Sequence, residues 1–265
     1  MLSESDDSRH VLVDAAVDSE AARGRRWAAP LTETLPILMY HHIAPPPPEG
    51  TPSRHLFVDP ARFKRQMHAL KQLGYQGCSI AELVPRFLLE KPGKYVGITF
   101  DDGYEDVYAN ALPILQETGF TATAYFVSRE VGGFNRWDSD LRFPLARCMT
   151  LQQMRQWKAL GHEIGGHTLE HRRLGEMAPG EVWRQIADCR RELEDLSGER
   201  VEAFSYPYGS FNYMTGALAR KAGFTSAVTT LKKRAAATDD PFLLPRFNVR
   251  TADRLVAFLW KCLLR

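Results

Sequence analysis

The feature that most constrains the fold is an alternation, almost throughout the chain, of short apolar runs with amphipathic helical segments. The apolar runs predict strands at residues 35–40, 75–78, 95–100, 121–127, 162–165, 203–206 and 225–229, with a last extended piece at 243–249. Helical spacing predicts helices at residues 59–73, 79–89, 104–115, 150–160, 181–196 and 213–222, and a final helix from 251. Such alternation implies parallel strands covered by helices, and about seven units suit a closed or nearly closed α/β barrel.

Local signals mark some of these elements. Asp59 precedes a proline and predicts a helix N-cap. Ser79 with Glu82 forms a capping-box pattern, and Pro113 inside a helical pattern predicts a kink. In barrels of this type the active site lies at the carboxyl ends of the strands, which directs attention to polar residues that follow the predicted strands.

Length and composition limit the function classes. The chain has 265 residues, 44% hydrophobic and 25% charged, which fits an ordinary globular protein with a sizeable core. We expect a polar N-terminal arm (residues 1–34), a barrel (35–250) and a C-terminal helix (251–265). A net charge of +2 without a run of basic residues argues against a nucleic-acid partner. The four cysteines have no CxxC spacing, which argues against a disulfide framework or a thiolate zinc site.

The sequence shows neither a signal-peptide core nor a transmembrane span, so we expect a cytoplasmic location. The apolar stretch from Leu255 to Leu264 is half the length that a span requires. A helix docked onto the body is the favoured interpretation. Peripheral membrane contact through Arg254, Lys261 and Arg265 is the alternative.

Two adjacent carboxylates, Asp101 and Asp102, directly follow the predicted strand 95–100. Buried carboxylates are costly unless they bind something, and neighbours at a strand end can point in different directions. One could therefore hold a metal while the other acts as a base on water. A pair of solvated loop acids is an equally good interpretation of this segment alone.

His167 and His171 follow the strand 162–165, and histidines four apart in a helical turn share a face. Together with an aspartate from the first cluster they would form a ligand set with open positions, as a catalytic metal needs. His41 and His42 end the first strand. We expect His41 to be functional, since a histidine here could protonate a leaving amine, and His42 to be a buried, hydrogen-bonded residue.

A fourth candidate segment, which is rich in aromatic residues, lies at the end of the strand 203–206. Tyr206 and Tyr208 could form a wall on which a sugar stacks, and a backbone N–H there could stabilise an oxyanion. An aromatic turn fixed by Pro207 and Gly209 is equally consistent with the sequence.

The segments 99–103 (TFDDG) and 167–171 (HTLEH) resemble the first two motifs of the polysaccharide deacetylases of the NodB-homology group, carbohydrate esterase family 4. The resemblance covers roughly residues 35–250 and implies a distorted (β/α)7 barrel. It also implies that Asp101 is the catalytic base and that Asp102, His167 and His171 hold the metal.

The chain departs from the usual motifs in two places. Ser205 stands where the third motif usually has arginine, and no counterpart of the C-terminal motif that carries the acid histidine is found. The segment 38–41 instead resembles the permuted arrangement of the subgroup that deacetylates poly-β-1,6-N-acetylglucosamine, which implies that His41 is the general acid. The segment 244–246 resembles the same subgroup. We hypothesise that Arg246 supplies, beside Asp101, the positive charge that the missing arginine would have placed there.

The resemblance therefore implies metal-dependent removal of acetyl groups from N-acetylglucosamine-type residues of a poly- or oligosaccharide. Zinc is the first choice of cofactor, and Co²⁺, Ni²⁺ and Mn²⁺ also suit two imidazoles and a carboxylate. The alternatives are a peptidoglycan sugar, a lipid-linked saccharide or a small non-sugar amide as substrate, and a non-catalytic sugar-binding relative. The loops 44–58 and 129–149 would set the substrate.

Overall fold

The computed structural model describes residues 34–88 and 93–263, so the predicted polar arm lies outside the described residues apart from Thr34. The strands are β1 (Thr34–Leu35), β2 (Ile37–Tyr40), β3 (Gln76–Cys78), β4 (Tyr95–Phe100), β5 (Thr123–Phe126), β6 (Glu163–Gly166), β7 (Ala203–Ser205), β8 (Ser226–Val228), β9 (Ala235–Ala236) and β10 (Phe247–Asn248). The α-helices are α1 (Pro60–Gln72), α2 (Ile80–Leu88), α3 (Leu112–Thr118), α4 (Leu151–Ala159), α5 (Pro179–Ser197), α6 (Tyr213–Lys221) and α7 (Leu255–Leu263).

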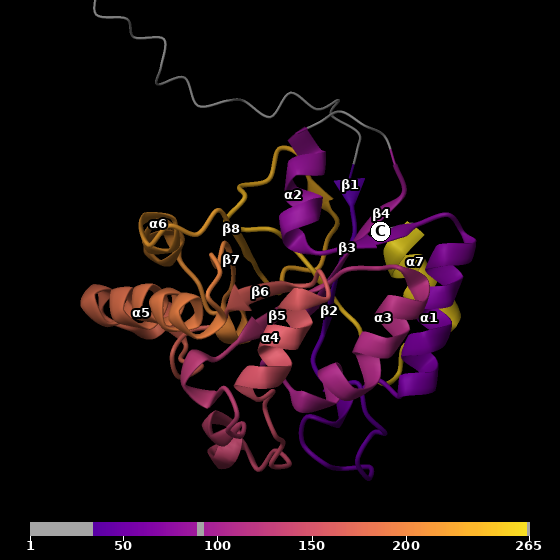
Figure 1. The fold of residues 1–265 in the computed structure, drawn as a ribbon, viewed down its shortest axis with the longest axis horizontal. Coiled ribbons are helices and arrows are strands. Elements are labelled where there is room, and N and C mark those ends of the chain that lie inside the picture. Colours follow the sequence, from indigo (N-terminus) through magenta and orange to yellow (C-terminus); the bar gives the residue numbers. More distant parts are fainter. Residues whose placement is uncertain (1–33, 89–92, 264–265) are drawn as a thin grey trace, which may run out of the picture.

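The strands of the main sheet run parallel in the order β10-β2-β4-β5-β6-β7-β8, and β3 pairs with the start of β4. The segment 241–248 joins the two edges of this sheet. Near its start, Leu244 accepts from Thr229 N–H and donates to Ala227 O, and at its end β10 pairs with β2. The described strands thus form the distorted α/β barrel that the sequence predicts, with helices around it (Figure 1).

Side chains alternate between the inside and the outside of the barrel, as a period of two requires. In β2, Leu38 and Tyr40 pack outward in the large apolar core between the strands and the helices. Ile37 belongs to a smaller cluster inside the barrel, and Met39 and His41 line a cavity at its carboxyl end. The barrel interior is therefore apolar at one end and open to polar groups at the other.

The helices pack their apolar faces against the outside of the barrel, as the amphipathic pattern predicts. In Figure 1, α1, α3 and α7 lie on one side of the barrel and α5 and α6 on the other. Asp59 caps α1, with Oδ1 2.9 Å from the N–H of Ala61. The predicted kink at Pro113 is a π-helical segment (Val107–Ala111) that leads into α3, because proline cannot complete the preceding turn.

The capping box predicted for α2 is half wrong. Ser79 Oγ accepts from the N–H of Glu82 at 3.3 Å, as expected. The Glu82 carboxylate, however, accepts from the hydroxyl of Thr121, whose Oγ1 accepts from Ser79 N–H. Thr121, which lies just before β5, therefore supplies the acceptor for Ser79 N–H that the sequence assigned to the helix itself.

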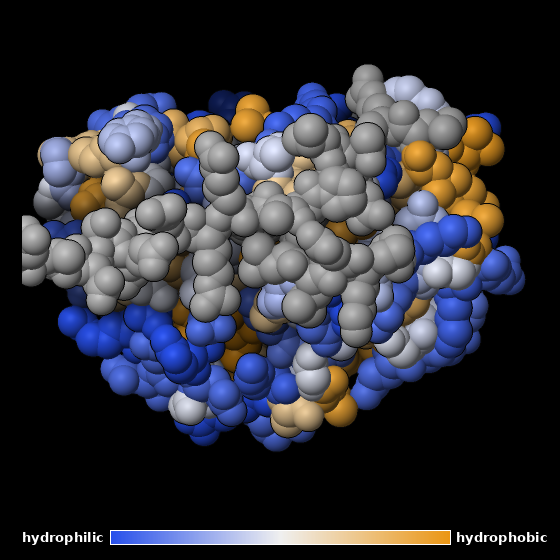
Figure 2. Space-filling view, turned by 90° about the horizontal axis from the view of Figure 1, so that it is seen from above, coloured by the Kyte–Doolittle hydropathy of each residue, from blue (hydrophilic) through white to orange (hydrophobic). Residues whose placement is uncertain are grey.

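The C-terminal helix begins at Leu255 rather than at residue 251 and is docked onto α1, with Phe258 and Cys262 buried. Val256 is 81% exposed on its outer side. Figure 2 shows apolar surface at its right edge, on the side where Figure 1 places α1 and α7. Among the described residues no helix is long and apolar enough to cross a membrane. Membrane contact and cytoplasmic location stay predictions, and Arg265 lies outside the described residues.

Candidate active site

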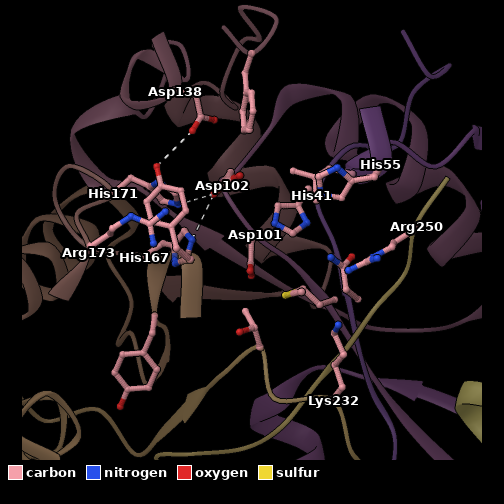
Figure 3. Close-up of a pocket in the computed structure, with 17 residues that line it drawn as sticks. His41, His55, Asp101, Asp102, Asp138, His167, His171, Arg173, Lys232 and Arg250 are labelled. Carbon is pink, nitrogen blue, oxygen red and sulfur yellow. Dashed lines mark hydrogen bonds and ion pairs between the residues drawn. The ribbon is translucent and has the colours of Figure 1, made fainter. Parts of the chain in front are cut away.

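A cavity of about 460 Å³ opens at the carboxyl end of the barrel, where the predicted catalytic and metal-binding residues come together (Figure 3). Asp101, Asp102, His167, His171 and His41 all line it. They reach it because the inward face of each strand continues past the strand end, so that His41, Asp101 and His167 follow the inner positions of β2, β4 and β6. The sequence placed these residues in one site, and the structure agrees.

The predicted metal ligands meet at one carboxylate oxygen. Oδ1 of Asp102 lies 3.3 Å from Nε2 of His167 and 3.2 Å from Nε2 of His171. All three side chains are buried. Burial alone would raise the pKa of Asp102, but the two imidazoles outweigh it and hold the pKa well below the usual range. The carboxylate is therefore ionised and available as a ligand.

The hydrogen bonds around this group fit a cation. Nδ1 of His167 lies 2.8 Å from the backbone oxygen of Ser205, an acceptor, so this nitrogen carries the proton. In the neutral imidazole, which is the form that binds a metal, Nε2 of His167 then presents a lone pair toward Asp102, which also offers only lone pairs. Such an arrangement is satisfied when a cation lies between them, and a carbonyl behind a ligating imidazole is the usual support for a metal site. Asp102, His167 and His171 are the described residues that group in this way.

The predicted helical turn between the two histidines is wrong. Residues 168–170 form an irregular turn, in which Thr168 and His171 adopt left-handed φ values of 68° and 56°. Asp102 is also left-handed, at 73°. Non-glycine residues pay for this conformation, and such strain gathers at functional sites. The imidazoles therefore converge because of the strained turn, not because of helical spacing.

Asp101 is held by a bidentate ion pair with Arg246. The guanidinium nitrogens lie 2.7 Å from Oδ1 and 2.8 Å from Oδ2, and Arg246 is fully buried. The same guanidinium donates to the hydroxyls of Thr99 and Ser205 and, through Nε, to the backbone oxygen of Thr229, each at 3.0 Å. Burial opposes ionisation of Asp101, but Arg246 and His167 together lower its pKa below the usual value.

The structure places Arg246 where the hypothesis required it. Ser205, at the motif position usually held by arginine, is small enough to leave room for the incoming guanidinium and bonds it. The serine at position 205 and the arginine at position 246 therefore compensate for each other: the small Ser205 side chain leaves a volume that the Arg246 guanidinium fills.

The two adjacent histidines after β2 have different surroundings. His42 is buried between the rings of Phe57 and Tyr104, at 4.0 and 3.7 Å, and its Nδ1 lies 2.7 Å from Oδ2 of Asp106. It is the buried, hydrogen-bonded residue that we expected. His41 instead borders the cavity, and its Nδ1 has no hydrogen-bond partner among the described residues.

The prediction that Tyr206 stacks on a sugar is wrong. Although it borders the cavity, its ring is 1% exposed, packs against Phe204 and Phe211, and donates its hydroxyl to the backbone oxygen of Phe242. The physical reason is strand parity. Ser205 occupies the inner face of β7, so the residue on either side of it must point outward toward the helices.

Tyr208 is in the cavity wall, as expected, with a φ of 57° and 36% exposure. Its ring contacts His171, its hydroxyl donates to Asp138 at 3.4 Å, and Arg173 lies over its face. Gly209 and Ser210 donate their N–H groups to nearby carbonyls, whereas the N–H of Tyr208 donates to no described backbone carbonyl. That N–H fits the proposed oxyanion donor.

Sequence reasoning missed several cavity residues, because they come from loops without a motif. Asp138 lies in the irregular insertion, where burial and then the charge of Asp102 raise its pKa to about 7. Trp137 beside it packs on His171, with ring centroids 4.9 Å apart. Lys232 and Arg250 follow β8 and β10. The only signal for them is their position after strands, which many loop residues share.

Comparisons with known proteins agree with this geometry. The profile of the family described as Polysaccharide deacetylase matches residues 89–227. The polysaccharide deacetylase-family protein YxkH of Bacillus subtilis (strain 168) is 30% identical over 217 residues, which cover 81% of this chain and 71% of that protein. The poly-β-1,6-N-acetyl-D-glucosamine N-deacetylase of Staphylococcus aureus (strain MRSA252) is 23% identical over 199 residues, 72% of this chain and 67% of that one.

Two solved structures share the fold. The Streptococcus pyogenes deacetylase PplD in complex with acetate superposes with a TM-score of 0.76 at 27% identity, over 87% of this chain and 98% of that one. IcaB from Ammonifex degensii gives a TM-score of 0.71 at 24% identity, over 86% and 97% of the two chains. The second likeness concerns the fold alone.

Proposed function

Because this chain belongs to the polysaccharide deacetylase family, we propose that it is a metal-dependent hydrolase that removes N-acetyl groups from N-acetylglucosamine-type residues of a poly- or oligosaccharide. The observation that carries the proposal is the meeting, in one cavity, of the Asp101–Arg246 ion pair with the group Asp102, His167 and His171. The two adjacent aspartates thereby have different roles: Asp101 is the base and Asp102 is a metal ligand.

The metal ligands would be Asp102, His167 and His171. A divalent cation held there, with Zn²⁺ as first choice and Co²⁺, Ni²⁺ and Mn²⁺ as alternatives, supplies Lewis acidity toward the amide carbonyl and the attacking water. Three protein ligands leave positions open for substrate and water, as in catalytic sites generally.

Asp101 is the proposed general base. Its carboxylate accepts the proton of the attacking water, and Arg246 keeps both oxygens oriented and ionised beforehand. A base whose pKa is lowered is weaker, so Asp101 depends on an attacking water that is already acidified. General acid–base groups of this kind contribute about 10²–10⁴-fold.

His41 is the proposed general acid, which protonates the sugar nitrogen as the C–N bond breaks. Burial is the main cause that lowers the pKa of His41, so its protonated form gives up the proton more readily than free imidazolium. The backbone N–H of Tyr208 is the proposed donor to the tetrahedral oxyanion. Acetate and the free amine are the products.

The substrate is proposed from relatives. A poly-β-1,6-N-acetyl-D-glucosamine N-deacetylase is among the similar proteins, which supports an N-acetylglucosamine polymer. The test is acetate release from β-1,6-linked and β-1,4-linked N-acetylglucosamine oligomers, a peptidoglycan fragment and a small N-alkyl acetamide, each with and without Zn²⁺. Release from no sugar, with protein shown to be folded and loaded with metal, would refute the proposal and favour a non-catalytic sugar-binding protein.

A further inference from the structure

One wall of the cavity carries cations that no acidic group neutralises. Lys232 and Arg250 line the cavity, and neither side chain forms an ion pair within the described part of the chain. The neighbouring Lys233, by contrast, pairs with Asp239 at 2.6 Å. Asp253 accepts from the backbone N–H of Arg250, but its carboxylate is paired with Lys261.

The acidic groups of the cavity lie apart from these cations. Figure 3 shows Arg250 and Lys232 with His55 on one side of Asp101, and Asp138, His167 and His171 on the other. Asp101 is already paired with Arg246. The wall that carries Lys232 and Arg250 therefore presents uncompensated positive charge to whatever lies beside the catalytic base.

The backbone holds both cations in defined loops. The hydroxyl of Thr251 lies 2.5 and 2.6 Å from the carbonyl oxygens of Arg54 and Phe57, and its N–H donates to His55 O, which fixes the loop that carries Arg250. The N–H of Arg246 donates to Leu231 O, which fixes the loop just before Lys232.

A third cation of the cavity behaves differently. Arg173, on the side of His171, lies over the ring of Tyr208 at 4.0 Å, so its charge is already engaged. Oδ1 of Asn248, which lines the cavity between the two loops, has no hydrogen-bond partner among the described residues. The wall thus combines two cations with an open polar position, as expected of a surface that receives a polar ligand.

We propose that Lys232 and Arg250 bind an anionic group, a carboxylate or a phosphate, carried by the N-acetylated sugar or by the residue next to it. The inference rests on the proposed deacetylase function and narrows its substrate class from N-acetylglucosamine-type poly- and oligosaccharides in general to those that bear an acid near the acetamido group. Both side chains are exposed, so the attraction is moderate and falls as salt is added.

The test uses substrates matched in everything except charge. N-Acetylglucosaminyl-N-acetylmuramic acid is compared with its methyl ester, and di-N-acetylchitobiose 1-phosphate with di-N-acetylchitobiose. We expect kcat/KM for acetate release to be about tenfold higher for the anionic member of at least one pair, and the ratio to shrink with added salt. A preference within the first pair identifies a carboxylate, and one within the second pair a phosphate.

Variants test whether Lys232 and Arg250 cause the preference, which is the ratio of kcat/KM for the anionic member of a pair to kcat/KM for the neutral member. Lys232→Gln and Arg250→Gln should each lower this ratio, and the double variant should bring it to about one. The matched controls Lys233→Gln and Arg254→Gln change exposed cations outside the cavity and should leave the ratio as in the wild type. Equal kcat/KM within both pairs, or equal losses in the control variants, would overturn the inference while leaving the deacetylase function intact.

If folded, metal-loaded wild type releases acetate neither from these four compounds nor from the oligomers and peptidoglycan fragment named above, the proposed function has failed. The inference is then tested separately by calorimetry, which compares the affinities of the wild-type protein for the anionic and the neutral member of each pair. Tighter binding of the anionic member, lost in the Lys232→Gln, Arg250→Gln double variant, supports it, and equal binding refutes it.

Discussion

Arg246 and Asp101 form a bidentate ion pair inside the barrel although they are 145 positions apart in the chain. Removal of one partner from a buried pair leaves an uncompensated charge, which typically costs about 3–5 kcal/mol. We expect Arg246→Ala to lower the free energy of unfolding by about that amount, measured by urea denaturation, and to lower kcat/KM by about 10²-fold or more. An Arg246→Ala enzyme with full activity would exclude the orienting role.

A relocated arginine should rescue that variant in part. Ser205 lies beside the guanidinium and holds the motif position usually occupied by arginine. We expect Ser205→Arg combined with Arg246→Ala to regain part of the lost acetate release, because the second guanidinium can fill the vacated volume. Ser205→Arg alone should be destabilising, since two guanidinium groups would then compete for one carboxylate. A double variant no better than Arg246→Ala would contradict this.

The two adjacent aspartates should separate by metal content. Asp101→Asn should abolish turnover while the protein keeps its metal, and Asp102→Asn should lose the metal as well as the activity. Metal content of the purified variants, measured by elemental analysis, decides between the roles. The opposite pattern would mean that the two roles are exchanged.

Metal binding should stabilise the fold. A ligand at about a hundred times its dissociation constant adds about 2.7 kcal/mol, which for a domain of this size raises Tm by about 5–10 °C. We expect a chelator to silence the enzyme, added Zn²⁺ to restore it, and Tm to rise with it in calorimetry. His167→Ala, which removes one ligand, should show no such rise, and a rise as large as in the wild type would exclude His167 from the site.

The histidine pair after β2 provides its own control. His41→Gln should lower kcat for an N-acetylated sugar by about 10²-fold or more, but should have little effect on hydrolysis of p-nitrophenyl acetate, whose leaving group needs no proton. His42→Gln should instead destabilise the protein, because it breaks the contact with Asp106 and the stacking with Phe57. Equal effects of His41→Gln on both substrates would remove the general-acid role.

His162 should make the fold sensitive to acid. Burial against Trp157 lowers its pKa to about 4, while the unfolded chain titrates near ~6.5. Between these values the unfolded state binds more protons, so stability falls as pH falls, by about 3 kcal/mol from pH ~6.5 to ~4. We expect His162→Gln to give a shallower slope of unfolding free energy against pH in this window, and an unchanged slope would contradict the assignment.

Strand parity explains much of what the sequence predicted about the site, and one of its errors. His41, Asp101 and His167 each lie an even number of positions beyond an inward-facing residue, so a period of two places all three in the cavity. The same rule, applied to β7, puts Ser205 inside and Tyr206 outside. The prediction for Tyr206 rested on its aromatic ring and did not consider which face of β7 the residue occupies.

Other features depend on contacts between distant segments, which local patterns do not encode. The strained turn that joins His167 to His171 is stabilised by its surroundings, and no residue in it signals a left-handed backbone. The small strand β9 pairs with β1 and carries no strong apolar pattern. Lys232 and Arg250 line the same cavity because the segment 241–248 pairs with both β8 and β2, a long-range contact that no local pattern predicts.

That closing segment has a consequence for how the protein is made. Arg246 leaves the ribosome more than two hundred positions after His41. A nascent chain that stops short of β10 has its aspartates and histidines but lacks the guanidinium that fixes Asp101. Catalytic competence should therefore arise late in translation, when the segment 241–248 pairs with β8 through Leu244 and with β2 through β10.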